Sequence, residues 1–236
     1  MSSPYFDFKQ FRVFHDRCAM KVGTDGVLLG AWARLAEGTK VLDLGTGCGL
    51  VALMMAQRFP FAKVTAVEIE PEAAAQAAEN FQASPFAERL EAVCSDVRNF
   101  VPEGGPFDCI VSNPPFFTED LLPPSAERSL ARNAADLPFA DLIGEAQRLL
   151  RPGGLFQVIL PCSVADGFLS LCAVRAFSLL ERMDVRTKPT KPAKRTLLCL
   201  VNDLAATRPC RKDFLLCSDH GERSADYQKL TQDFYL

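Results

Sequence analysis

Three acidic residues stand where short apolar runs of the chain end. Asp43 lies at the end of the run 40–44, Glu68 near the end of the run 63–69, and Asp96 just after the run 90–94. Ligands of open α/β sheets bind at the edge where parallel strands end, so these carboxylates are expected to share one site. There Asp43 would hold a cationic ammonium, and it would repel a pyrophosphate.

Three glycines follow Asp43 before the next predicted helix. They are Gly45, Gly47 and Gly49, and they let the backbone approach a ligand closely where the first strand ends. The dinucleotide-binding fingerprint requires a further glycine at position 50, where this chain has Leu50. The pattern therefore favours a nucleotide-like ligand that carries positive charge.

S-adenosylmethionine has the groups that these carboxylates would bind. Its ammonium suits Asp43, and its adenine amine could donate to Asp96. Glu68 lies 21 residues after Gly47, where doubly wound folds hold the ribose hydroxyls. In the alternative interpretation, Asp43 and Asp96 cap a helix or loop, and the neighbouring Glu70 favours a helix N-terminus.

A proline-rich loop follows the apolar run 107–112. It reads Asn113-Pro114-Pro115-Phe116, and its prolines stiffen the backbone that holds Asn113. An exocyclic amine is a poor nucleophile because its lone pair is delocalised into the ring. The Asn113 side-chain oxygen and the Pro114 carbonyl could hold both amine hydrogens and aim the lone pair at a sulfonium methyl, while Phe116 stacks on a planar base. The alternative is a surface turn with a capping asparagine.

These motifs need an alternating framework of strands and helices to bring them together. Strands are predicted over 40–44, 63–69, 90–94, 107–112, 155–160, 178–186 and 196–201, and helices over 49–59, 71–83, 141–150 and 164–177. Helical crossovers impose a parallel sheet, and the last two strands, with no helix between them, suggest an antiparallel C-terminal hairpin at one edge. We therefore expect an α/β, doubly wound, Rossmann-like fold with a mostly parallel seven-stranded sheet.

The motif set resembles that of class I methyltransferases that methylate planar nitrogen. The segments 8–11, 15–26, 29–32 and 230–236 are similar to the family of bacterial adenine-N6 methyltransferases of valine tRNA, which modify the adenine 3′ of the anticodon. This resemblance covers essentially the whole chain. It implies S-adenosylmethionine as cofactor, tRNA as substrate, and Lys21, Thr24 and Asp25 as lining of the cofactor pocket. From the residues alone, 23–26 is only a turn.

The resemblance also implies one methyltransferase domain over residues 1–236. Its expected parts are a capping segment over 1–39, the core sheet over 40–202, and a C-terminal tail over 203–236 packed on the core. Phe116 departs from the pattern, because many relatives have tyrosine at this position. Phenylalanine keeps the stacking face and lacks the hydroxyl.

Charge is distributed unevenly along the chain. The whole chain carries −3, whereas residues 182–212 hold nine Lys/Arg against two Asp, a net +7 that leaves −10 for the remainder. The connection 187–195 is predicted to contact RNA phosphates, with a second basic cluster flanking the other side of the pocket. The candidate RNA-binding residues are Lys188, Lys191, Lys194, Arg195, Lys9 and Arg12. The alternative is a solvated loop that protects a sheet edge.

Composition bounds the remaining possibilities. Nearly half of the residues (48%) are hydrophobic, as in ordinary globular proteins, and no apolar run approaches the ~20 residues of a membrane helix. Nine cysteines form no Cys-x-x-Cys pair and neither histidine is spaced with one, so no metal is expected. Because the sequence shows no secretion signal, a cytoplasmic location is predicted. The protein is also expected to be a monomer.

Two other functions compete with RNA methylation. Glutamine-N5 methyltransferases of protein substrates use the same loop on a side-chain amide, but only 39 residues precede the first predicted strand here, too few for a separate substrate-binding domain. A catalytically dead fold that binds RNA is disfavoured by the intact acids and Asn113. Binding of S-adenosylmethionine in a calorimeter would separate the dead fold from the enzymes.

Overall fold

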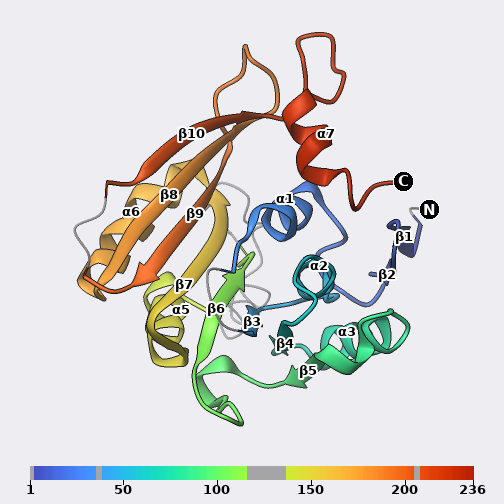
Figure 1. Cartoon of the computed structure of the whole chain (residues 1–236), viewed down its shortest axis with the longest axis vertical. Coiled ribbons are helices and arrows are strands. Elements are labelled where there is room, and N and C mark those ends of the chain that lie inside the picture. The colour runs from blue at the N-terminus through green and yellow to red at the C-terminus, as the bar shows by residue number, and fades with distance from the viewer. Residues whose placement is uncertain (1–2, 36–38, 116–136, 205–207) are drawn as a thin grey trace, which may run out of the picture.

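The computed structural model describes residues 3–35, 39–115, 137–204 and 208–236. Its centre is an eight-stranded sheet in the order β10-β8-β9-β7-β6-β3-β4-β5 (Figure 1). The strands, in chain order, are β3 (Lys40–Leu44), β4 (Lys63–Glu68), β5 (Leu90–Cys94), β6 (Phe107–Ser112), β7 (Leu150–Pro161), β8 (Phe177–Arg186), β9 (Arg195–Asn202) and β10 (Cys210–Leu215). In this sheet β9 runs antiparallel to both of its neighbours, and the other pairs are parallel.

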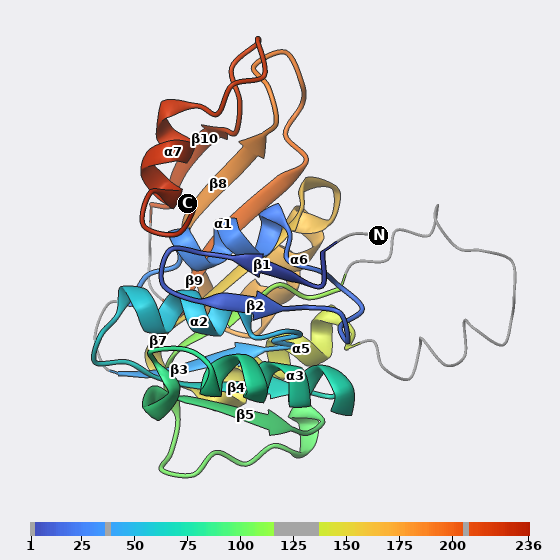
Figure 2. The same ribbon diagram turned by 90° about the vertical axis from the view of Figure 1, so that its right-hand side faces the viewer.

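Helices cover both faces of the sheet. The helices are α1 (Thr24–Trp32), α2 (Leu50–Arg58), α3 (Pro71–Gln82), α5 (Phe139–Leu149), α6 (Cys162–Val174) and α7 (Ala225–Thr231), with 3₁₀ turns η1 (Ala87–Arg89) and η2 (Val97–Asn99). Helices α1, α2, α3 and α7 lie on one face and α5 and α6 on the other (Figures 1 and 2). The sheet has a hydrophobic core on each face, and in β3 Val41 packs in the core beneath α1 and α2 whereas Leu42 packs in the core beneath α5 and α6. Continuous apolar strands result, because both faces are buried.

The sequence predicted the α/β class and most of the sheet correctly, but the strand count was wrong. Strands 40–44, 90–94 and 107–112 have the predicted bounds. The additional strand is β10, which pairs parallel to β8, so the β8–β9 hairpin is not at the edge and the sheet extends past residue 202. In β10 only Phe214 is buried, so the alternation that reveals a strand is absent.

The N-terminal residues form more structure than expected. Residues 24–26 open α1 rather than forming only a turn, and a small hairpin joins β1 (Tyr5–Asp7) to β2 (Arg12–Phe14). This hairpin packs against the C-terminal residues (Figure 2), and the Lys9 N–H donates to the Phe234 carbonyl at 2.8 Å. Among the helices that the structure describes, none is long and apolar enough to cross a membrane.

Candidate functional site

Two adjoining cavities, of about 460 and 330 Å³, lie where β3, β4 and β6 end. They share Met20, Gly45 and Gly47 as lining residues. The chain order of the sheet reverses between β3 and β6, which is where doubly wound sheets bind ligands. Ser112 fastens this edge, because its hydroxyl donates to the Leu44 carbonyl at 2.8 Å.

The glycine-rich turn needs its glycines for backbone reasons. Gly45, Gly47 and Gly49 have φ of 69°, 55° and 85°, a region that L side chains rarely adopt. This conformation points the Gly47 N–H at the Glu68 carboxylate, 2.8 Å away. Gly45 and Gly47 line both cavities, so the backbone of this turn borders the candidate site.

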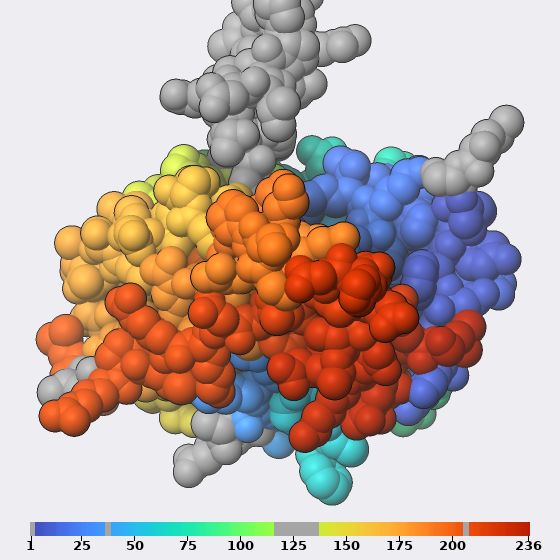
Figure 3. All heavy atoms as spheres, turned by 90° about the horizontal axis from the view of Figure 1, so that it is seen from above, coloured from blue at the N-terminus to red at the C-terminus, as the bar shows by residue number. Residues whose placement is uncertain are grey.

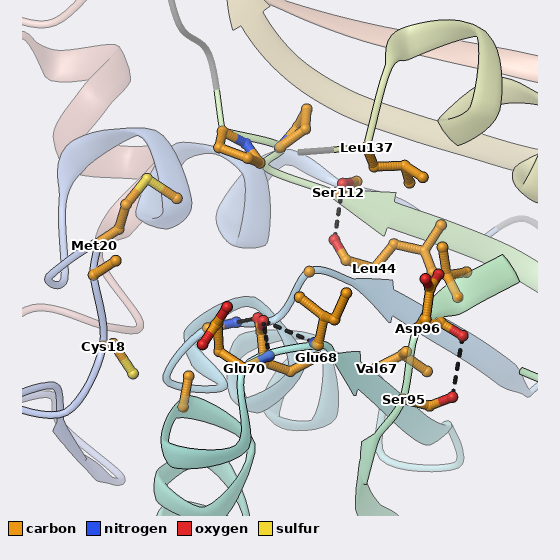
Figure 4. Close-up of a pocket in the computed structure, with 18 of the residues that line it drawn as sticks. Cys18, Met20, Leu44, Val67, Glu68, Glu70, Ser95, Asp96, Ser112 and Leu137 are labelled. Carbon is orange, nitrogen blue, oxygen red and sulfur yellow. Dashed lines mark hydrogen bonds between the residues drawn. The ribbon is translucent and has the colours of Figure 1, made fainter. Parts of the chain in front are cut away.

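Glu68 is buried and held by backbone donors. Besides the bond from Gly47, it accepts from the N–H groups of Ile69 at 2.9 Å and Glu70 at 3.1 Å. Both Glu68 and Glu70 line the larger cavity, but Glu70 is exposed at the N-cap of α3 (Figure 4). The structure therefore distinguishes the neighbours: Glu68 is fixed in place, whereas Glu70 lies at the helix N-terminus as the alternative proposed.

Asp43 lies in the wall of the smaller cavity with only 1% of its surface exposed. One carboxylate oxygen accepts from the Thr46 hydroxyl at 2.6 Å and from the Ala52 N–H at 3.1 Å in the first turn of α2. Burial raises the pKa of Asp43 to about 7. The helix-capping contact expected as the alternative is thus present, and the side chain still borders the cavity where an ammonium would lie.

Asp96 is a loop cap in the structure and also lines the larger cavity. It accepts from the Arg98 N–H at 2.9 Å and pairs with the Arg98 guanidinium at 2.5 Å. The hydrogen bond from that guanidinium holds the pKa of Asp96 below its usual range. A carboxylate that stays ionised is an acceptor for an amine N–H.

The Asn-Pro-Pro loop begins at the boundary between the two cavities. Asn113 lines the smaller cavity, and Pro114 and Pro115 line the larger one. The Asn113 Oδ1 atom is buried and accepts no hydrogen bond from the residues that the structure describes. Buried polar oxygens are normally paired, so this acceptor can take a hydrogen bond from a donor on a bound molecule. Phe116 lies outside the described residues.

The N-terminal residues complete the walls. Lys21, Thr24 and Asp25 all line the smaller cavity, where the resemblance implied they would be. Sequence reasoning missed Cys18 and Met20, which face Glu68 across the larger cavity (Figure 4). Both fall inside the segment 15–26, so the family resemblance was the only available signal.

The basic candidates divide into two groups. Lys191 and Lys194 are exposed between β8 and β9, and Lys188 donates to the Asp219 carbonyl at 3.3 Å. This connection lies beside the C-terminal segment (Figure 3), and the Cys217 N–H donates to the Thr187 carbonyl at 3.0 Å.

Arg195, Lys9 and Arg12 make contacts within the protein. Arg195 donates to Asp25 at 2.7 Å, Lys9 donates to the Gln232 carbonyl at 2.6 Å, and Arg12 pairs with Asp7 at 2.5 Å. Lys9 and Arg12 are not among the described residues that line either cavity. These two residues therefore tie the N-terminal hairpin together and to the C-terminal tail.

Metal chemistry has no ligand set in the described part of the chain. Within those residues, no group of three or more His, Cys, Asp or Glu side chains is close enough to hold a metal ion.

Comparisons with known proteins show which family the chain belongs to. Residues 22–164 match the methyltransferase small domain family. A tRNA1(Val) (adenine(37)-N6)-methyltransferase from Bacteroides fragilis strain YCH46 is 44% identical, covering 100% of this chain and 99% of that protein. One of the same name from Pectobacterium carotovorum is 43% identical, covering 98% of this chain and 93% of that protein.

Solved structures share the fold. A predicted O-methyltransferase from Agrobacterium tumefaciens superimposes with a TM-score of 0.72 at 21% identity, over 89% of this chain and 96% of that one. The 16S rRNA N2 G1207 methyltransferase of T. thermophilus gives a TM-score of 0.59 at 24% identity, over 85% of this chain and 51% of that one. With a matching methyltransferase domain and full-length similarity to these relatives, the chain belongs to the family of bacterial tRNA1(Val) (adenine(37)-N6)-methyltransferases.

Proposed function

We propose that this chain transfers a methyl group from S-adenosylmethionine to N6 of the adenine 3′ of the anticodon in valine tRNA, acting as a cytoplasmic monomer. The observation that carries the proposal is the buried, unpaired Oδ1 of Asn113 at the junction of the two cavities. An exocyclic amine has N–H donors of the kind that this acceptor lacks among the described residues.

The residues around the cavities suit S-adenosylmethionine. Asp43 and Asp25 place carboxyl oxygens in the wall of the smaller cavity that can accept from an ammonium, and Lys21 suits the carboxylate of the same methionine tail. The larger cavity combines apolar walls, such as Val67 and Val97, with the Glu68 carboxylate, a combination that suits an adenosine. Bound there, S-adenosylmethionine supplies a methyl group on a cationic sulfonium.

The chain's own contribution is positioning. The Asn113 side-chain oxygen and the Pro114 carbonyl accept the two N–H hydrogens of the adenine amine, which directs its lone pair at the methyl group. No strong base is required, because the nitrogen becomes cationic as the methyl group leaves the sulfur, and it then loses its proton to water. Fixed acceptors of this kind accelerate a reaction without reorganising during it.

The basic β8–β9 connection is the proposed contact with the tRNA backbone. Lys188, Lys191 and Lys194 lie near the same sheet edge as the cavities, since Arg195, the next residue, pairs with Asp25 in the smaller cavity wall. An acidic enzyme that binds a polyanion needs a local positive surface, and three clustered lysines provide one.

Methyl transfer to tRNA is tested with labelled S-adenosylmethionine and an unmodified valine tRNA transcript. The expected result is label in N6-methyladenosine after nucleoside analysis, and none when the target adenine is replaced by guanine. A glutamine-containing release-factor peptide serves as the protein substrate control. Label in the peptide but not in the tRNA, or label in neither substrate, would overturn the proposal.

A further inference from the structure

One segment that lines both cavities has no secondary structure of its own. We call residues 14–22 the N-terminal strap; after Phe14, the last residue of β2, they belong to no helix or strand until α1 begins at Thr24. Arg17, Cys18, Ala19 and Met20 line the larger cavity, and Met20 and Lys21 line the smaller one. The position of the strap therefore depends on contacts with other elements.

Gln76 of α3 supplies three of those contacts. Its side chain is only 2% exposed. Its amide oxygen accepts from the Arg17 N–H at 3.1 Å and from the Cys18 thiol at 3.2 Å, and its amide nitrogen donates to the Asp16 carboxylate at 2.6 Å. One buried amide thus holds three consecutive residues of the strap.

Asn80, one helical turn later on the same face, holds the start of the strap. It is 1% exposed and exchanges two hydrogen bonds with the backbone of Phe14, each 2.9 Å long. Its amide nitrogen also donates to the Cys48 carbonyl at 2.8 Å, inside the glycine-rich turn. Asn80 therefore joins the strap, α3 and the turn at one point.

The chemistry of these two side chains indicates more than packing. The rest of this helical face is alanine and phenylalanine, with Ala73, Ala77 and Phe81 all buried. A buried amide is costly unless its hydrogen bonds are made, and here the bonds reach the strap rather than neighbouring helices. An apolar residue at either position would make none of these hydrogen bonds to the strap.

We propose that Gln76 and Asn80 are positioning residues that clamp the N-terminal strap over the cofactor cavities. The clamp keeps Cys18 and Met20 in the wall, so release of the cofactor requires the strap to leave Gln76. The ion pair of Arg17 with Glu79 reinforces it, but that pair is exposed and adds little. The inference depends on the proposed function only in that the ligand of these cavities is S-adenosylmethionine.

The test compares Gln76→Met with Gln82→Met, which alters an exposed glutamine at the end of the same helix. Affinity for S-adenosylhomocysteine is measured by calorimetry, and strap opening by limited trypsin cleavage after Arg17 and Lys21. Loss of three modest hydrogen bonds should weaken binding by about tenfold or more. We expect Gln76→Met to raise KM for S-adenosylmethionine while kcat changes little, and to accelerate cleavage in the strap alone.

A second variant guards against loss of folding. Asp16→Ala removes one partner of Gln76 at an exposed position of the strap without touching α3, and it should weaken binding and accelerate cleavage in the same direction. If Gln76→Met and Asp16→Ala match Gln82→Met in affinity and in strap cleavage, the clamp is refuted. If the parent binds no S-adenosylhomocysteine, the cofactor assignment fails instead, and the cleavage rates alone decide whether the strap is clamped.

Discussion

The backbone N–H of Gly47 donates to the carboxylate of Glu68 at 2.8 Å, although the two residues are 21 positions apart. Because Gly47 follows β3 and Glu68 ends β4, this bond joins two strand ends into one wall of the larger cavity. The same carboxylate accepts from Ile69 and Glu70, so its orientation is fixed before any ligand binds. Preorganisation of this kind lowers the cost of binding.

Replacing Glu68 by alanine should therefore weaken binding of S-adenosylmethionine by roughly ten- to a hundredfold, because a charged hydrogen bond contributes about 1.5–3 kcal/mol. Glu70→Ala is the matched control, since Glu70 is exposed at the N-cap of α3. Calorimetry on both variants measures the difference. Equal losses would contradict the assignment of Glu68 over its neighbour.

The raised pKa of Asp43 should make the stability of the folded protein depend on pH. Burial raises its pKa to about 7 from a usual 3.8, so between these values the folded protein holds a proton that the unfolded chain has lost. Stability must then fall as pH rises from about 4 to about 7. Asp43→Asn removes this dependence, so its Tm advantage over the parent should grow across that window and level off above it. A difference that stays constant with pH would show that Asp43 does not titrate this way.

Replacing Asn113 by alanine should affect the rate of methylation without affecting thermal stability. Asn113→Ala removes an acceptor that has no donor among the described residues, so Tm should not fall. The single-turnover methylation rate should fall by a factor on the order of 100, as for other fixed polar groups, with cofactor affinity nearly intact. A variant that methylates tRNA at the parent rate would mean that this loop is structural only.

Salt dependence tests the β8–β9 connection. Replacing Lys188, Lys191 and Lys194 together by alanine should flatten the log–log salt slope of tRNA binding by about two units, at about 0.7 per phosphate contact. Affinity for S-adenosylhomocysteine should not change. Lys63→Ala is the control, because Lys63 is the first residue of β4 and lies at the end of the strand away from the cavities. An unchanged slope in the triple variant would mean that the connection does not contact RNA and only protects the edge of the sheet.

Cys18 offers a chemical probe of cavity occupancy. It is half-buried in the wall of the larger cavity, and its hydrogen bond with Cys48 lowers the pKa of its thiol. Alkylation by N-ethylmaleimide should slow at Cys18 when S-adenosylhomocysteine is present, and continue unchanged at exposed Cys210 on β10. Mass spectrometry of the labelled peptides measures both rates. Equal protection of the two thiols, or of neither, would argue against a ligand beside Cys18.

The strands around the site could be predicted because their signal is local. The run 107–112 is apolar and β-branched, and Asn113-Pro114 follows it directly, so the strand and the loop come from neighbouring residues. In the same way, Asp43 and Glu68 mark their own strand ends. The sequence alone therefore determined the fold class, the glycine-rich turn and the side chains at the sheet edge.

Tertiary structure decided the elements whose own pattern is weak. The segment 24–32 contains Gly26 and Gly30, and its own residues predict only a turn over 23–26, but it packs as α1 directly on α2. A Cβ at position 30 would overlap the side chain of Met54, so the glycine that weakens the helix locally permits the close approach that stabilises it. Strand β10 also depends on tertiary structure. Its polar sequence does not predict a strand, and β8 supplies its backbone hydrogen-bond partners.

The functional contacts that sequence reasoning missed connect distant parts of the chain. Arg195 pairs with Asp25 across 170 positions, and Asn80 joins Phe14 to Cys48. Periodicity reports which face of an element is buried, but not which buried amide meets which backbone group. That choice depends on how α3 and the strap pack together, and only the assembled fold brings their donors and acceptors within hydrogen-bond distance.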